Sequence, residues 1–144
     1  MSGLKNTTSN LELAKYCKKL KIHNVVICMR DELTNLSKHT TNIIMNLEDH
    51  NGNGSHWVGI YNNQVKYYFD SYGLPPPVEV MKFLQNAVYQ TFQIQELNSK
   101  CCGQLCLYYK VHIKDQVELG KKAIARNIMT HLFCSRNNVY LYLL

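Results

Sequence analysis

The segment His56–Asp70, "HWVGIYNNQVKYYFD", decides how the rest of the chain is arranged. Apolar and aromatic side chains fill its two halves, and two polar residues, Asn62 and Asn63, separate them. Strands favour such side chains, and asparagine favours the tight turns that join antiparallel strands. The sequence therefore predicts a β-hairpin with its turn at Asn62–Asn63, in which His56 opens one strand and Asp70 closes the other.

The chain before this hairpin predicts one helix and two strands. The runs at 24–29, "NVVICM", and 42–47, "NIIMNL", are short and rich in β-branched residues, which is typical of buried strands. A helix is expected over 9–21, with Ser9 or Asn10 as its N-cap. The inward stripe of this helix is Leu13, Tyr16, Cys17 and Leu20.

Beyond the hairpin, a helix and a strand are expected. Gly73 and the prolines at 75–77 end the second hairpin strand. Apolar residues then follow at positions 80, 83, 84, 87 and 88, which is helical spacing. A short strand, "TFQIQ", is predicted at 91–95.

The C-terminal third of the chain predicts two helices. Helical spacing is kept by Leu105, Tyr108, Tyr109, His112 and Ile113. A last helix is expected over about 116–133, with Ile124, Ile128 and Leu132 inward. The segment 135–144 fits either a closing strand or a tail. Together, these elements indicate one α+β domain spanning 1–144, with a mixed and largely consecutive sheet flanked by helices.

Composition limits the protein class. The chain has 144 residues, 46% of them hydrophobic and 18% charged, which is typical of a globular domain. Its apolar runs are too short to span a bilayer, and its opening lacks the pattern of a signal peptide. We therefore expect an intracellular protein without a membrane segment, whose six cysteines are thiols. The net charge of +6 fits a nucleic-acid or acidic partner. The first helix has lysines at 15, 18, 19 and 21, which form either a solvated face or a face that contacts DNA.

A second stretch, "QELNSKCCGQLC" at 95–106, contains candidate cysteine nucleophiles at the point where it leads into a predicted helix. A cysteine in the first turn of a helix is favoured as a thiolate by the helix dipole, and Cys102 is expected there. Gly103 leaves the backbone uncrowded, so that the Cys102 N–H can point at a developing oxyanion. Cys101 lies one residue before the helix and lacks a following glycine. A core role is expected for the remaining cysteines, Cys17, Cys28, Cys106 and Cys134.

A cysteine nucleophile needs a base and a group that orients the base. Of the six histidines, only His56 opens an apolar strand directly after a loop rich in Gly, Asn and Ser. Asp70, at the end of the partner strand, can hold the imidazole, although an aspartate before "SYG" also fits a turn. The side-chain amide of Gln95 can donate to the oxyanion, and Gln93 would lie on the same face of a strand.

A zinc site is the competing interpretation of clustered cysteines. The three cysteines between 101 and 106 contain no C-x2-C pair, and no histidine lies near them at ligand spacing. We therefore expect no metal site here.

These motifs resemble a known protease family. "GSHWVGIY", "YYFDSYG" and "QELNSKCCGQLC" are similar to the His, acidic and Gln/Cys boxes of the adenovirus endopeptidase (adenain) family and its clan, which includes the SUMO-specific proteases. The likeness covers about 22–113, where "CMRDEL" and "NLED" resemble segments of adenain-like proteases from polinton-type elements and virophages. The order His, Asp, Cys, with a Gln shortly before the Cys, is that of this clan. The resemblance implies a papain-like, circularly permuted fold, with the catalytic boxes within 56–106.

The resemblance also implies a role for each motif residue. His56 is the general base, Asp70 its orienting carboxylate and Cys102 the nucleophile. Gln95 and the Cys102 N–H form the oxyanion hole, and Trp57 lines a narrow substrate channel. No cofactor is required for this chemistry.

The implied function is a cysteine endopeptidase that cleaves viral precursor polypeptides at glycine-containing sites. In adenovirus the enzyme is stimulated by DNA and a short viral peptide, so either is a candidate activator. We expect a monomer in the nucleus, cytoplasm or virus factory of a host cell, or in the virion. The alternatives are deconjugation of ubiquitin-like modifiers, against which the single tryptophan argues, and a catalytically silent module that binds DNA or a capsid protein.

The two adjacent cysteines need one more distinction. Counted from Gln95, Cys101 fits the six-residue step of SUMO-type enzymes and Cys102 the seven-residue step of adenain-like ones. Gly103 and the helix start favour Cys102. A further hypothesis is that Cys101 forms a vicinal disulfide with Cys102 under oxidation and silences it.

Overall fold

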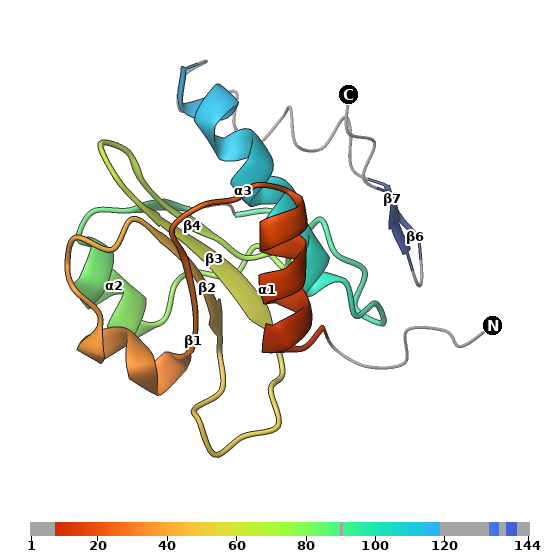
Figure 1. Ribbon diagram of the computed structural model, residues 1–144, viewed down its shortest axis with the longest axis horizontal. Helices are drawn as coiled ribbons and strands as arrows, with labels where there is room; N and C mark the ends of the chain where they lie inside the picture. Colours follow the sequence, from red (N-terminus) through yellow and green to blue (C-terminus); the bar gives the residue numbers. More distant parts are fainter. Residues whose placement is uncertain (1–7, 90, 119–132, 136–137, 141–144) are drawn as a thin grey trace.

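The computed structural model describes residues 8–89, 91–118, 133–135 and 138–140, with side chains described as far as Lys110 (Figure 1). It is a single α+β domain built on a mixed sheet of five strands, which confirms the predicted class. The strands lie side by side in chain order. Their bounds are Val25–Met29 for β1, Asn42–Asn46 for β2, Trp57–Asn62 for β3, Lys66–Phe69 for β4 and Val88–Tyr89 for β5.

The three inner strands form an antiparallel meander, while each outer strand is parallel to its neighbour. β2 pairs with β3, and β3 with β4, in antiparallel fashion. β1 is parallel to β2, and β4 is parallel to β5. Parallel neighbours need a crossover connection, and short helices supply it. The 3-10 helix η1 (Arg30–Asn35) joins β1 to β2, and α2 (Val78–Leu84) joins β4 to β5.

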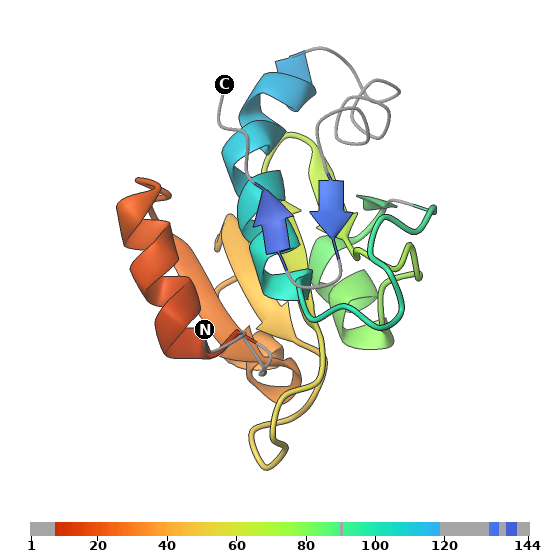
Figure 2. The ribbon, with the colours of Figure 1, turned by 90° about the vertical axis from the view of Figure 1, so that its right-hand side faces the viewer.

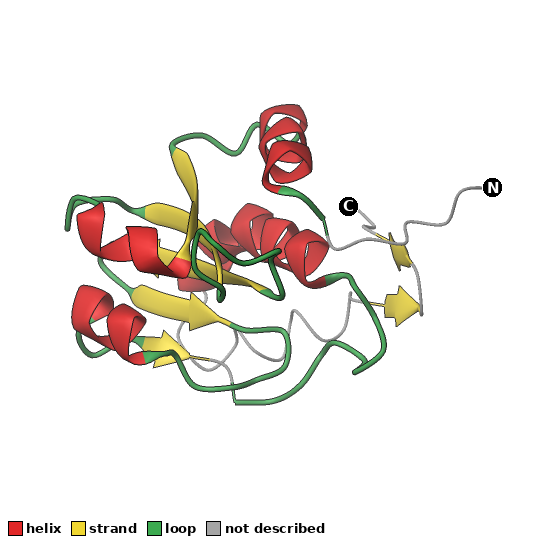
Figure 3. Ribbon diagram, turned by 90° about the horizontal axis from the view of Figure 1, so that it is seen from below, coloured by secondary structure: helices red, strands yellow, loops and turns green. Residues whose placement is uncertain are grey.

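Helices cover both faces of the sheet. α1 (Asn10–Lys19) and α3 (Cys102–Glu118) pack on one face, and η1 and α2 lie on the other (Figures 1 and 2). Seen from below, the strands are enclosed between helices (Figure 3). Each face has its own core, because alternate side chains of a strand point to opposite sides of the sheet.

Aromatic side chains stack on one another in the core beneath α3. Tyr109 stacks on Phe69 with ring centroids 4.7 Å apart, and on Tyr67 with centroids 5.2 Å apart. The opposite core is mostly aliphatic and contains Ile43, Ile60, Val80, Phe83 and Leu84. Burial of a large apolar side chain contributes about 1.5–3 kcal/mol, so these two layers stabilise the sheet that carries the candidate site.

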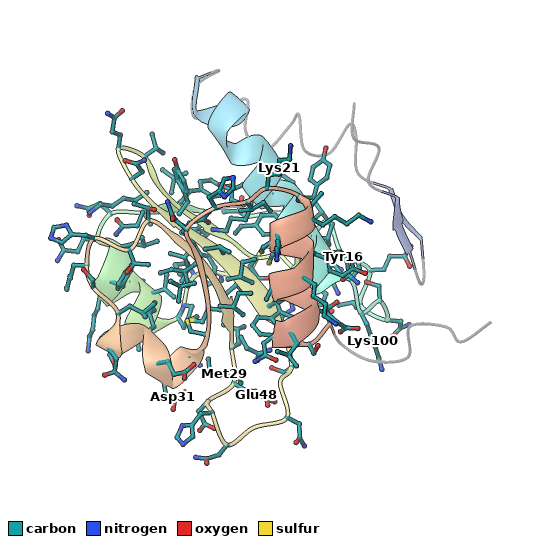
Figure 4. The ribbon with its side chains drawn as sticks, viewed as in Figure 1. Tyr16, Lys21, Met29, Asp31, Glu48 and Lys100 are labelled. Carbon is teal, nitrogen blue, oxygen red and sulfur yellow. The ribbon has the colours of Figure 1, made fainter. Side chains whose placement is uncertain are left out.

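The first helix begins and packs largely as predicted. Ser9 is the N-cap and forms a capping box with Glu12. Leu13 and Cys17 are buried, as expected of the inward stripe. Tyr16 is 41% exposed, so its predicted inward orientation is wrong. Figure 4 shows Tyr16 on the outer side of α1, because this helix contacts the rest of the domain through a narrow stripe.

The strands on either side of the predicted hairpin turn are confirmed, but the turn lies elsewhere. Asn62 pairs with Lys66 in the sheet, so the loop consists of the three residues 63–65. The reason is not local: the Asn62 side chain donates to the Lys38 carbonyl at 2.8 Å, and its backbone N–H donates to the Thr41 carbonyl at 2.8 Å. These bonds hold Asn62 in β3.

The shifted turn changes which side chains share a face. In the observed register Ile60 pairs with Tyr68, so even-numbered residues of both strands lie on the same face. Extended to the strand ends, this register places His56 and Asp70 on one face. A two-residue turn at Asn62–Asn63 would have shifted the register by an odd number of residues and separated them.

The segment between α2 and α3 differs from its prediction. α2 ends at Leu84, because Gln85 and Asn86 adopt left-handed backbone angles with φ of 47° and 55°. Val88, which was expected in the helix, instead belongs to β5. The predicted strand at 91–95 is irregular, so that prediction is wrong.

The C-terminal part is described only in pieces. α3 runs to Glu118, and the predicted helix beyond it, with Ile124, Ile128 and Leu132, lies outside the described residues. β6 (Phe133–Ser135) pairs with β7 (Asn138–Tyr140) in a separate two-stranded sheet, so neither strand closes the main sheet. Among the described residues, no helix is long and apolar enough to cross a membrane.

Candidate active site

The two ends of the β3–β4 hairpin bring an imidazole and a carboxylate together. His56 Nε2 lies 2.8 Å from Asp70 Oδ1. Both side chains are largely buried, with exposed fractions of 11% for His56 and 1% for Asp70. A hydrogen bond shielded from water in this way fixes the orientation of the ring.

Asp70 also builds the turn that follows β4. Its Oδ1 accepts the N–H of Tyr72 at 2.8 Å, and its carbonyl accepts the N–H of Gly73 at 2.9 Å. Gly73 has φ of +71°, and a Cβ there would lie 2.5 Å from the backbone of Phe92. Only glycine fits this position. The same aspartate therefore shapes the turn and holds His56.

Cys102 joins this pair from the other side of the fold. It is the first residue of α3, whose first turn is closed by the Leu105 N–H donating to the Cys101 carbonyl. Its thiol is free and only 3% exposed. The Cys102 side chain lies close enough to the imidazole of His56 to raise its pKa. Because Nε2 of that ring faces Asp70, Nδ1 is the nitrogen left for Cys102.

The environment of His56 favours its protonated form. Burial alone would lower the pKa of this imidazole, but its interactions with the side chains of Asp70, which accepts from the ring, and of Cys102 outweigh burial and raise the pKa to about 9. At neutral pH the ring is therefore an imidazolium held between a carboxylate and a sulfur. This arrangement can stabilise a thiolate and later deliver a proton.

The neighbouring cysteine is in a different state. Cys101 is disulfide-bonded and buried, and the Ser99 hydroxyl lies 3.3 Å from its sulfur. Because the Cys102 thiol is free, the hypothesis of a vicinal bond between the two is wrong for this structure. The expectation that all six cysteines are thiols is also wrong, since composition cannot show which sulfurs a fold brings together.

Gln95 lies near the site but is already committed to other partners. Its Nε2 donates to the Ser99 carbonyl at 2.9 Å and to the Tyr72 hydroxyl at 3.2 Å. Its Oε1 accepts the hydroxyl of Ser71. Both N–H groups of the amide are therefore used, and the structure does not bring Gln95 to Cys102 directly. Gln93 supports it by donating to the Gln95 carbonyl at 2.6 Å.

Two residues of the site were missed by the sequence analysis. Tyr72 lies against His56 and accepts from Gln95, and Ser71 accepts the backbone N–H groups of Ile94 and Gln95 at its carbonyl. These contacts fasten the irregular 91–95 segment to the turn after β4. Their sequence signal is the polar "SYG" directly after Asp70, which by itself indicates only a turn.

Trp57 lies on the other side of the strand from the His56–Asp70 pair. It is 4% exposed, and its indole N–H donates to the Thr8 carbonyl at 2.7 Å. Its own carbonyl accepts the thiol of Cys106 at 3.3 Å. Trp57 therefore anchors the N-terminal segment, and its ring forms one wall of a pocket lined also by Thr8 and Asn53.

Gly103 is explained by packing. A Cβ on Gly103 would lie 3.1 Å from Thr8 Cβ and 3.2 Å from Leu13 Cδ2. The glycine therefore allows the N-terminal segment and α1 to approach the start of α3. The missing side chain at Gly103 also leaves the backbone at Cys102 uncrowded. Close packing and access to the Cys102 N–H are therefore compatible explanations of this glycine.

No metal-binding group is apparent in the part of the chain that the structure describes, where no set of three or more His, Cys, Asp or Glu side chains could hold an ion. The chemistry that the arrangement offers is that of a sulfur nucleophile, an oriented base and helix N–H donors. Compared with protein-family models and with characterised proteins, the sequence has no match. The functional argument therefore depends on this geometry.

Proposed function

We propose that the protein is a cysteine endopeptidase with Cys102 as nucleophile, His56 as general base and acid, and Asp70 as the carboxylate that orients His56. The observation that carries the proposal is the contact of one buried imidazole with both Asp70 and Cys102. His56 and Asp70 come from the two ends of the β3–β4 hairpin, and Cys102 comes from the start of α3. Such a constellation is recognised by its geometry.

The reaction follows from the positions of these groups. The Cys102 thiolate attacks the carbonyl carbon of the scissile peptide, forming a C–S bond and an oxyanion. His56, protonated at neutral pH, donates its proton to the leaving nitrogen, and the C–N bond breaks. The neutral imidazole then takes a proton from water, which attacks the thioester and releases the acid. Asp70 keeps the ring in one orientation throughout.

The oxyanion is stabilised first by the backbone N–H of Cys102. The first N–H groups of a helix have no partner within the helix, and Cys102 opens α3. The side-chain amide of Gln95 can donate a second hydrogen bond to the oxyanion only after it releases one of its present acceptors. The bond from Nε2 to the Tyr72 hydroxyl is the longer of its two, at 3.2 Å against 2.9 Å to Ser99. Binding of substrate would exchange the Tyr72 bond for one to the oxyanion.

The sequence resemblance supplies the substrate class and the finer fold assignment. An adenain-like protease with a papain-like, circularly permuted domain would cleave precursor polypeptides at glycine-containing sites. The order of His56, Asp70, Gln95 and Cys102 along the chain, and the approach of a helix start to the end of a hairpin, support this. Activation by DNA or a viral peptide is a separate proposal, supported by the net charge of +6.

Alkylation and cleavage together test the nucleophile. Brief iodoacetamide treatment near pH 7, read by peptide mass spectrometry, should modify Cys102 ahead of Cys28, because burial raises the pKa of the Cys28 thiol to about 12. Cys102→Ala should abolish cleavage of a Gly-Gly peptide series, while Cys28→Ala, the matched control, should retain it. Modifier-type substrates and added DNA, assayed in parallel, separate the deconjugating alternative and DNA activation.

Two results would contradict the proposal. Cleavage that persists in a folded Cys102→Ala protein would remove the nucleophile. A His56→Ala protein that is folded and fully active would show that the imidazole is structural. Loss of activity with an unchanged circular-dichroism spectrum and melting temperature in both variants is the expected result.

A further inference from the structure

A polar pocket adjoins the candidate site on the side of Trp57. It encloses about 350 Å³ between the start of α1, the end of β2 and the loop that precedes His56. Met29 and Trp57 give it apolar walls, and Thr8, Asn46 and Asn53 give it polar ones. Figure 4 shows Met29 and Glu48 at this end of the sheet, near the loop before β3. Pockets of about 300 Å³ and above are large enough to hold a ligand group.

Asn46 presents an unused donor to this pocket. The residue is only 1% exposed. Its Oδ1 accepts the backbone N–H groups of Glu48 at 3.0 Å and Ser55 at 3.2 Å, which fixes the orientation of the amide. Nδ2 must then face the opposite way, towards Gly54 and the pocket. Within the described part of the chain, no acceptor bonds to Nδ2.

Asn46 Nδ2 therefore opens onto the pocket, and because no acceptor of the described residues takes it, an acceptor atom of a ligand in the pocket can bind there. Glycine at position 54 keeps this approach open. A Cβ there would lie 3.2 Å from Asn46 Nδ2, and φ is +82°, which favours glycine. The donor and the space in front of it thus depend on two specific residues.

The pocket disfavours both kinds of ionised ligand, because an anion would lie near Glu48 and because lysine and arginine have no acceptor atom for Asn46 Nδ2. None of the carboxylates or lysines of the described chain lines the pocket. His50 is the one ionisable group on its wall, and its ring is engaged with the Asp31 carboxylate. Glu48 accepts the N–H of Gly54, one of the lining residues, at 2.8 Å, so a ligand carboxylate in the pocket would meet like charge.

We infer that this pocket is a specificity subsite for a neutral side chain that ends in a carbonyl oxygen, which among encoded residues means glutamine or asparagine. The carbonyl accepts from Asn46 Nδ2, and the aliphatic stem lies against Trp57 and Met29. The inference rests on the proposed function only for the statement that the ligand belongs to a polypeptide substrate.

The pocket shares walls with the neighbours of the reacting groups. Trp57 directly follows His56, and Thr8 packs against the position of Gly103, which directly follows Cys102. A substrate residue in the pocket therefore lies a short length of chain from the scissile bond. Such a subsite would control KM more than kcat, since it binds a part of the substrate that does not react.

Binding can be measured without catalysis, because Trp57 is the only tryptophan of the chain and lines the pocket. The full chain with Cys102→Ala is titrated with blocked peptides in which each of three residues before a Gly-Gly pair is in turn Gln, Met, Glu or Lys. Tryptophan fluorescence reports occupancy. At one position the Gln peptide should bind about tenfold more tightly than the Met peptide, the loss expected for one hydrogen bond to a buried donor.

Asn46→Asp provides the matched test. It keeps an oxygen for the backbone N–H groups of Glu48 and Ser55, replaces the donor by a second oxygen and adds one negative charge, so the Gln preference should disappear. Asn51→Asp adds the same charge to the exposed part of the loop, outside the pocket, and should retain the preference.

The outcomes separate the two proposals. Equal binding of Gln and Met peptides, a preference that survives in Asn46→Asp, or no fluorescence change with any peptide overturns the subsite. If the wild-type protein cleaves peptides but shows none of this selectivity, the subsite fails and the protease proposal stands. If the Gln preference is present and no cleavage is found with wild-type protein, the subsite stands and the protease proposal fails.

Discussion

Tyr72 lies almost flat against His56, with ring centroids 4.7 Å apart and planes inclined by 26°. The same tyrosine accepts a hydrogen bond from Gln95 through its hydroxyl. One side chain therefore contacts both the proposed base and the proposed oxyanion donor. An aromatic face stabilises a cation placed against it, so the stack favours the imidazolium form of His56.

The first prediction concerns this stack. Tyr72→Ala should lower the pKa of His56 by about half a unit, because a cation–π contact of this kind contributes about 0.5–1 kcal/mol. The ring of His56 would also lose the surface that limits its rotation. We expect kcat to fall about tenfold to a hundredfold, as for other small displacements of reacting groups. NMR titration of His56 and the pH dependence of kcat measure both effects.

Tyr72→Phe is the matched control. It keeps the stacked ring and frees one N–H of Gln95, so the pKa of His56 should stay near its wild-type value, and kcat should stay within about threefold. An equal loss of kcat in the Phe and Ala variants would show that the hydroxyl, and not the stack, is what matters.

The regular elements were predictable wherever local pattern sets them. The β-branched runs became β1 and β2, and Ser9 capped α1. The hairpin turn was predicted one residue early and too short, because Asn62 is held by backbone groups at Lys38 and Thr41. Such non-local bonds leave no local pattern in the sequence.

The site shows the same limit. His56, Asp70 and Cys102 could be predicted because they lie at the ends of strands or at the start of a helix. A side chain at such a place is held in position and is still accessible. Tyr72 and Thr8 contribute through their packing against His56 and Gly103. The sequence around them indicates only a turn or a terminal segment. The commitment of Gln95 to Ser99 and Tyr72 could not be predicted either, since it depends on the irregular path of the 91–95 segment.

The second prediction concerns Lys110, a buried lysine two turns after Cys102 in α3. It is 5% exposed, and its Nζ donates to the Ile60 carbonyl. Burial lowers the pKa of this lysine to about 7, while the nearby thiols of Cys106 and Cys17 act weakly in the opposite direction. Because the unfolded chain holds this proton up to a pKa near 10.5, stability gains from Lys110 as pH rises from 7 to 10.5.

His56 has the opposite dependence. Its folded pKa of about 9 exceeds the ordinary 6.5, so its contribution is full below pH 6.5 and is lost as pH rises to 9. Between pH 7 and 9 the two residues therefore offset each other in the wild type. Lys110→Met should stabilise the protein at pH 7 by on the order of 2–4 kcal/mol, since it removes the cost of burying a lysine.

Urea unfolding between pH 6 and 10 measures how the free energy of unfolding of each variant depends on pH. In Lys110→Met the free energy of unfolding should fall steadily from pH 6.5 to 9, because only the His56 dependence remains. Lys66→Met, on the hairpin, is the control and should keep the wild-type profile, which is flat between pH 7 and 9. A Lys110→Met protein that is less stable at pH 7 than the wild type would show that the Nζ bond to Ile60 outweighs the cost of burial.

The last prediction concerns the contact between the N-terminal segment and the start of α3. Gly103→Ala places a methyl group 3.1 Å from Thr8 Cβ, which should displace this segment and destabilise the protein by about 1–2 kcal/mol. The loss should appear although alanine is the better helix former. Because the Thr8 carbonyl accepts the Trp57 indole N–H, the tryptophan emission should shift as well.

A double-mutant cycle identifies Thr8 as the cause. Thr8→Gly keeps the carbonyl for Trp57 and removes the side chain, so Gly103→Ala should cost less in that background, with a coupling of about 1 kcal/mol. Leu13 Cδ2, 3.2 Å away, accounts for the cost that remains. Gly59→Ala is the control, because its added Cβ would meet neighbours at 3.5 Å or more. Additive losses in the cycle would mean that Thr8 does not constrain Gly103 and that Leu13 or α3 itself accounts for the whole cost.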